Sequence, residues 1–225
     1  ICRMLGYEII DQNNFTVPTQ EKLLDENLSI PGKKSITIPL GEVKISRKVN
    51  SFTVIFRSCT SINMLTQTKK RLLDKSKSEY TFRSLNSLIQ SLHNASKDLS
   101  KIKFNFVVID HNSKTSDLDK IINMLKKSDL KYEIIQLNVS EFSEKIKTIN
   151  EKKEKVTDNQ ISNMANIYKS LITAKLQDKD LIYFVEDDYL HHKDTIKEMI
   201  FTYERVASQI DNELILCPAD YPYLY

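Results

Sequence analysis

Short apolar segments alternate along the chain with amphipathic segments, and this alternation limits the folds that the chain can adopt. The apolar segments are rich in β-branched and aromatic residues, as buried strands are, and they span Phe52–Phe56, Phe104–Ile109, Tyr132–Leu137, Leu181–Val185 and Leu214–Cys217. Between them, apolar residues recur at helical spacing. The order β-α-β-α-β-α-β-α-β predicts an α/β fold with a mostly parallel, doubly wound sheet, right-handed crossovers and flanking helices.

Polar residues mark where the predicted helices begin. The sequence Thr-Asp-Asn-Gln at 157–160 has the form of a capping box before the third helix. Ser116 or Asp117 is the expected cap of the second helix, and Asp194 that of the fourth. The charged segment 140–156 has weak periodicity and is predicted to be a mobile loop or a short exposed helix.

The first fifth of the chain differs from the rest in its turn-forming residues. All three glycines and three of the five prolines lie before residue 50. We therefore predict an N-terminal extension over residues 1–50, with a small hairpin at 35–45, and a main domain over residues 51–225. The chain begins with Ile1 and ends at Tyr225 without a terminal signal. The main domain is therefore expected to be incomplete at its C-terminus.

Charge and cysteine content narrow the class of protein. The 33 basic and 30 acidic residues are mixed along the chain, so no dedicated nucleic-acid surface is predicted. The three cysteines lie far apart and offer neither a disulfide framework nor a zinc-binding spacing. No apolar run is long enough for a transmembrane segment, and the first residues lack the apolar region of a signal peptide. The expected location is cytoplasmic, with a peripheral position at a membrane left open.

Two of the predicted strands run directly into carboxylates. Asp110 follows the second strand, and Glu186, Asp187 and Asp188 follow the fourth. The carboxyl ends of parallel strands share one edge of a sheet, where ligands of open α/β folds bind. Adjacent carboxylates repel each other unless a cation compensates them, and Mg²⁺ or Mn²⁺ needs only one or two of them when phosphate oxygens complete its shell. The pattern favours a metal–diphosphate site. The alternative is that these acids cap helices or face solvent.

These residues resemble a known family. The sequence V-V-I-D-H-N-S-K-T-S-D at 107–117 resembles the second-strand motif of family 2-type glycosyltransferases with the GT-A fold. The sequence Y-F-V-E-D-D at 183–188 is similar to their D-x-D (DXD) metal motif. The resemblance covers about residues 52–217. It implies a Rossmann-like domain of the nucleotide-diphospho-sugar transferase superfamily, of hexosyltransferase type, which uses Mn²⁺ or Mg²⁺ and a nucleotide-diphosphate sugar.

The resemblance also implies roles for individual residues. Asp188 would be the principal metal ligand, Glu186 would hold the ribose or a metal-bound water, and Asp187 would assist. The nucleotide would be bordered by residues at the ends of the first two strands and in the third helix, namely Arg57, Ser58, Thr60, Asp110 and Asn166. This sequence departs from the family at His111 and Asn112, which replace the usual Asp-Gly.

The catalytic base is the least defined element. In inverting members of the family, a carboxylate beyond the fifth strand deprotonates the acceptor, and Asp220 is the only late acid in a suitable position. A base in a missing C-terminal segment is the favoured explanation. The predicted function is metal-dependent sugar transfer to a glycan, lipid or small-molecule acceptor. The alternatives are a non-catalytic nucleotide-sugar-binding or partner-docking module and, third, a phosphoreceiver-type module. No hydrolase elbow or P-loop is present.

Overall fold

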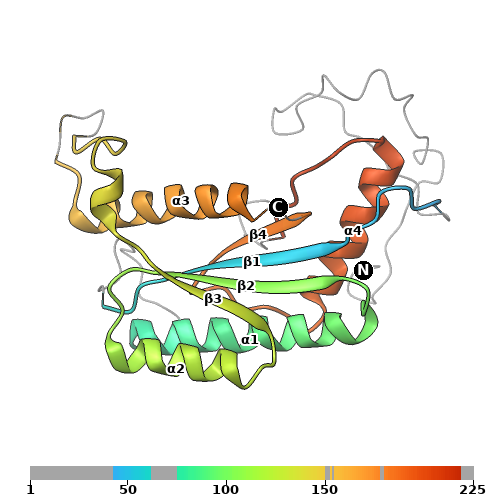
Figure 1. Ribbon diagram of the computed structural model, residues 1–225, viewed down its shortest axis with the longest axis horizontal. Coiled ribbons are helices and arrows are strands. Elements are labelled where there is room, and N and C mark those ends of the chain that lie inside the picture. The colour runs from blue at the N-terminus through green and yellow to red at the C-terminus, as the bar shows by residue number, and fades with distance from the viewer. Residues whose placement is uncertain (1–42, 62–74, 150–152, 154, 178–179, 219–225) are drawn as a thin grey trace, which may run out of the picture. The chain divides into compact units, whose positions relative to one another are not determined.

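The computed structural model describes residues 43–61, 75–149, 153, 155–177 and 180–218 (Figure 1). The chain divides into two compact units, of which the larger is Val49–Ile200 and the smaller combines Ile1–Lys48 with Phe201–Tyr225. The predicted domain boundary at residues 50 and 51 stays a prediction. Among the described residues, no helix is both long enough and apolar enough to cross a membrane.

The larger unit is built on a parallel sheet, as predicted. Its strands are β1 (Ser51–Ser58), β2 (Lys103–Asp110), β3 (Lys131–Gln136) and β4 (Leu181–Glu186), and their spatial order is β3-β2-β1-β4. Every neighbouring pair is parallel. The central strand β1 is buried along nearly its whole length. This burial explains its continuous apolar run, since both of its faces are covered.

Helices cover both faces of the sheet (Figure 1). Helices α1 (Lys77–Asp98) and α2 (Thr115–Lys126) lie on one face, and α3 (Asp158–Leu176) lies on the other. The reason is the handedness of the crossovers. The chain moves from β1 to β2 and β3 in one direction and then returns past β1 to β4, so that a right-handed connection places α3 on the opposite face. Helix α4 (Thr195–Ile210) begins in the larger unit and ends in the smaller.

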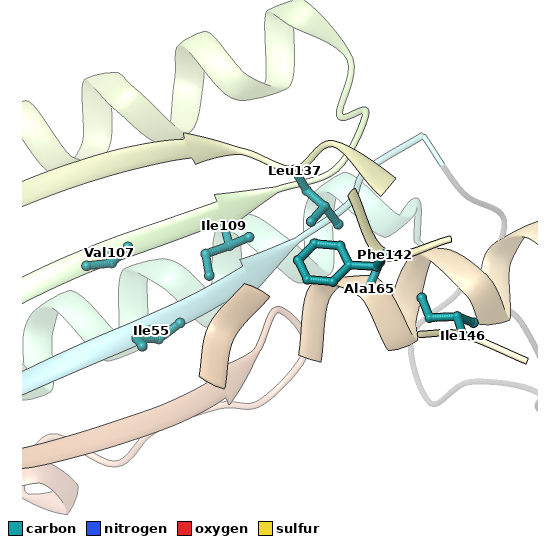
Figure 2. Close-up of a cluster of buried hydrophobic side chains, with 7 residues drawn as sticks. All are labelled: Ile55, Val107, Ile109, Leu137, Phe142, Ile146 and Ala165. Carbon is teal, nitrogen blue, oxygen red and sulfur yellow. The ribbon is translucent and has the colours of Figure 1, made fainter. Parts of the chain in front are cut away.

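The face covered by α3 contains a cluster of buried side chains that Figure 2 shows in close-up. Ile55 of β1 and Val107 and Ile109 of β2 belong to it, together with Leu137, Phe142, Ile146 and Ala165. Because side chains alternate along a strand, the odd-numbered residues of β1 and β2 in this cluster face α3. The even-numbered residues therefore face α1 and α2.

Two sequence predictions need correction. Leu214–Cys217 forms no strand, and Ile215 is 99% exposed, because this apolar run has no strand partner within the described part of the chain. Helix α2 begins at Thr115 after Lys114, so neither Ser116 nor Asp117 is its cap.

The segment 140–156 is predicted to be a mobile loop or a short exposed helix, and most of its described residues are exposed. It begins with a short 3-10 helix, η4 (Val139–Phe142), and buries Phe142 and Ile146 in the core, which the sequence did not indicate because two isolated apolar residues leave no periodic pattern. The capping box at Thr157 and Gln160 is confirmed. Helix α4 starts directly after Asp194. Most of the predicted hairpin at 35–45 lies outside the described residues.

Candidate functional site

The carboxyl ends of β1, β2 and β4 meet at one edge of the sheet. The order of the strands reverses at β1, since β2 and β3 lie on one side of it and β4 on the other. Such a reversal is the place where open α/β sheets bind ligands. The strand register pairs Ser58 with Asp110 and Arg57 with Glu186. The sheet thus brings together the acids that follow β2 and β4.

Asp110 lies on the α1 and α2 face and is 1% exposed. Its Oδ1 accepts hydrogen bonds from Ser58 Oγ at 2.7 Å and from Ser113 Oγ at 2.5 Å. Its Oδ2 accepts one from the Ser113 backbone N–H at 3.2 Å. Three donors from this chain satisfy most of what a carboxylate can accept. Asp110 therefore joins the ends of β1 and β2 and orders the loop that follows β2.

The loops after β1 and β2 are tied to each other. The Thr60 N–H donates to Ser113 Oγ at 2.9 Å, and the Lys114 N–H donates to Thr60 Oγ1 at 3.1 Å. Asn112 in the second loop has a φ of 55°, in the left-handed region. Asn tolerates this conformation better than most residues, which explains how it can stand where the resembled family has Gly. The loop keeps a tight turn without glycine.

Glu186 points to the opposite face of the sheet, toward α3. Its carboxylate forms an ion pair with Arg57, whose guanidinium also donates to Asn163 Oδ1 of α3 at 3.2 Å. The Glu186 side chain is 48% exposed, so solvent screens this pair, and its contribution to stability is modest. The pair places one cation and one carboxylate at the α3 side of the edge.

Asp187 returns to the α1 face and is buried. Its Oδ1 forms an ion pair with Lys77 Nζ, in the first turn of α1. Its Oδ2 accepts from Thr81 Oγ1 at 2.8 Å and from the Cys59 N–H at 3.4 Å. Sequence reasoning did not identify Lys77 or Thr81 as site residues, because neither belongs to the motifs at the strand ends. The i, i+4 spacing of Lys77 and Thr81 was the available signal, since it puts both on one helix face.

Asp188 lies near a basic group of α1 and is more accessible than Asp187. Its side chain is 34% exposed, and its Oδ2 lies 4.0 Å from Lys77 Nζ. The described residues contain no group of three or more His, Cys, Asp or Glu side chains that could hold a metal ion. Mg²⁺ and Mn²⁺ need only one or two protein carboxylates where phosphate oxygens and water complete the shell. The donor set at Asp188 fits that kind of site and does not fit an all-protein cage.

Asn166 and Asp220 are the remaining predicted site residues. Asn166 is a buried residue of α3. Its side-chain Nδ2 donates to the backbone carbonyl of Ile109 in β2 at 3.3 Å, and its own backbone carbonyl accepts from Ser170 Oγ at 2.8 Å. It thereby holds α3 against β2. Asp220 lies outside the described residues. The nucleotide, metal and catalytic roles of all these residues stay predictions.

Two ionisable side chains near the edge are shifted toward their neutral forms. Burial lowers the pKa of His111, and its Nδ1 lies 2.6 Å from Ser162 Oγ of α3. Burial also raises the pKa of the Cys59 thiol, and the nearby carboxylates of Asp110 and Asp187 act in the same direction. A neutral thiol is a poor nucleophile and a poor metal ligand. Within the described part of the chain, the ion pairs at the edge join its carboxylates to Arg57 and Lys77.

No family model matches the sequence, and no curated protein matches it significantly. A structural similarity exists to the crystal structure of S. aureus TarS, residues 1–349, with a TM-score of 0.34 and 18% sequence identity. The match covers 66% of this chain and 31% of that chain, so this chain spans about a third of the TarS structure.

Proposed function

We propose that this chain is the nucleotide-sugar-binding domain of a metal-dependent glycosyltransferase with a GT-A fold. One observation carries the proposal. Two strand ends that bear carboxylates, at Asp110 and at Glu186–Asp188, flank β1 at the point where the strand order reverses. That place suits a nucleoside diphosphate, and the sequence motifs at both strand ends resemble those of the family.

The proposal assigns roles to several side chains at the edge. Asp110 and its serine partners shape the surface that borders the ribose and base. Arg57 lies at the α3 side, where it is positioned by Glu186 and Asn163 and offers a positive charge to a diphosphate. Asp188 holds the divalent cation, which offsets the negative charge that develops on the leaving diphosphate. The acceptor is a glycan, lipid or small molecule that receives the sugar.

The experiment is a binding measurement on the whole chain. Thermal-shift screening of UDP, GDP, CDP and ADP sugars with Mn²⁺ identifies the donor, because a bound ligand stabilises the folded state by mass action. Calorimetry then measures the affinity for the corresponding nucleoside diphosphate. Asp188→Ala is expected to abolish the Mn²⁺-dependent part of binding. Asp119→Ala, at an exposed position of α2, is the matched control and should bind as the unmodified chain does. Unchanged binding by Asp188→Ala would remove the metal role from this residue.

A non-catalytic nucleotide-sugar-binding module is the second candidate. The observation that favours it is that Glu186 and Asp187 are both paired with cations of this chain, and Asp110 accepts three internal hydrogen bonds. The two candidates differ in turnover. A transferase is expected to release nucleoside diphosphate from the donor identified by the screen, whereas a binding module stabilises that donor without consuming it. If the unmodified chain releases nucleoside diphosphate and Asp188→Ala does not, the non-catalytic binding module is excluded.

A further inference from the structure

One lysine lies against two of the acids at the proposed metal site. Lys77 is the first residue of α1, and its side chain is 17% exposed. Its Nζ forms an ion pair with Asp187 and lies 4.0 Å from Asp188 Oδ2. The resemblance to glycosyltransferases assigned no role to it. Its amino group sits next to the carboxylate that is proposed to hold the divalent cation.

Lys77 is held in place from both ends. Its backbone is in the first turn of α1, after the N-cap Ser76, which accepts from the Glu79 N–H at 3.3 Å. Its partner Asp187 is itself anchored, because Oδ2 accepts from Thr81 Oγ1 at 2.8 Å and from the Cys59 N–H at 3.4 Å. A buried carboxylate with both oxygens engaged is a poor metal ligand but a good anchor for a lysine. The positive charge therefore stays beside Asp188.

A fixed positive charge at this position opposes a divalent cation. Charges about 4 Å apart near a protein surface interact by much more than the thermal energy, and partial exposure reduces this effect without removing it. The ammonium group makes the electrostatic potential at Asp188 less negative, so a metal ion binds more weakly there when the protein is its only source of ligands. The oxygens of a bound diphosphate add negative charge on the solvent side. With the diphosphate bound, the cation has phosphate oxygens as additional ligands, and Lys77 does not compensate their negative charge.

We propose that Lys77 is a built-in counter-cation of the Asp187–Asp188 pair, which makes divalent-cation binding at Asp188 depend on the phosphate oxygens of the donor. This inference rests on the function proposed above and specifies the order in which that site fills. Lys77 is a positioning residue in this account: it acts on the cation through the charge at Asp188. The free chain keeps its acid triplet compensated, and the metal enters together with the nucleotide.

The test compares variants of the whole chain by calorimetric titration with MnCl₂, first alone and then with the nucleoside diphosphate that the screen selects. The unmodified chain is expected to bind Mn²⁺ at least tenfold more weakly alone than with the nucleotide. Lys77→Met is expected to bind Mn²⁺ alone about tenfold more tightly than the unmodified chain, because the opposing charge is gone. Lys77→Arg keeps the charge and should behave as the unmodified chain. Lys75→Met, at an exposed position two residues earlier, is the matched control.

Two further variants separate charge from structural damage. Asp187→Asn keeps an acceptor for Thr81 but leaves the Lys77 charge uncompensated, so Mn²⁺ binding with nucleotide should weaken about tenfold. The double variant Lys77→Met with Asp187→Asn restores the original net charge and should bind Mn²⁺ nearly as the unmodified chain does. A merely structural role for Lys77 would weaken binding in every variant and cannot produce the tighter binding. Circular dichroism shows whether Lys77→Met folds. If it does not, the Mn²⁺ affinities of Asp187→Asn and of the double variant test the proposal.

The outcomes distinguish the two levels of proposal. Equal Mn²⁺ affinity of Lys77→Met and Lys75→Met, with nucleotide-dependent metal binding intact, overturns the role of Lys77 and leaves the proposed function standing. Tight Mn²⁺ binding by the unmodified chain alone overturns the role of Lys77 as well. Absence of nucleotide binding by the unmodified chain overturns the proposed function, and the inference about Lys77 fails with it.

Discussion

Replacing Asp110 by alanine is expected to lower the free energy of unfolding by about 3–5 kcal/mol. The carboxylate is 1% exposed and accepts hydrogen bonds from two serine hydroxyls and one backbone N–H. A hydrogen bond to a charged group contributes about 1.5–3 kcal/mol net, and the three bonds to one carboxylate are not additive. The substitution also leaves Ser58, which is 2% exposed, with a buried hydroxyl that has lost its acceptor. The loss is a large fraction of the stability of an ordinary domain, about 5–15 kcal/mol.

Urea unfolding followed by circular dichroism measures this effect. Asp119→Ala is the control, since it removes an exposed carboxylate from α2 and should change stability by less than about 0.5 kcal/mol. Ser58→Ala alone should cost about 1–2 kcal/mol, and adding it to Asp110→Ala should cost less than the sum, because both changes remove the same bond. A loss below about 1 kcal/mol for Asp110→Ala would refute the structural role assigned to this carboxylate.

Asp110→Asn refines the test. An asparagine can turn its carbonyl toward the Ser113 N–H and its amide toward the two hydroxyl oxygens, which are able to accept. All three contacts are then kept without the charge, so the loss should be clearly smaller than that of Asp110→Ala. Equal losses for the two variants would mean that the negative charge, and not the hydrogen-bond geometry, holds the ends of β1 and β2 together.

Three other changes have defined outcomes. Leu88→Ala, at a fully buried position of α1, should cost about 2–5 kcal/mol in urea unfolding because it leaves a cavity, and a loss below about 1 kcal/mol would contradict its packing. Thr157→Ala removes the capping box of α3 and should cost about 1 kcal/mol, whereas Thr157→Ser should cost little. Burial lowers the pKa of His191 to about 4, so between pH 6.5 and 4 the unfolded chain binds more protons at this site, and its contribution to stability falls as the pH is lowered. Thermal unfolding at pH 7 and pH 5 should show a smaller drop for His191→Gln, and an NMR titration midpoint near pH 6.5 would contradict the shift.

Local patterns in the sequence determined most of the architecture. Short continuous apolar runs predicted the four strands, and apolar residues at a period of 3.6 predicted the helices of the α/β fold, because each pattern depends only on residues close together in the sequence. The same reasoning failed where burial depends on a distant partner. Leu214–Cys217 has a strand-like composition but forms no strand, and Phe142 enters the core from a segment that has no pattern.

The candidate site divides in the same way. The sequence alone placed Asp110 and Glu186–Asp188 at strand ends, since each acid directly follows an apolar run. Only the tertiary structure decided their partners. Arg57 and Glu186 are 129 positions apart and Lys77 and Asp187 are 110 apart, and each pair meets because strand register and the start of α1 bring it together. Strand β4 ends at Glu186, which faces α3, and Asp187 directly after it faces α1, so an acid triplet that is continuous in sequence becomes three carboxylates in different surroundings.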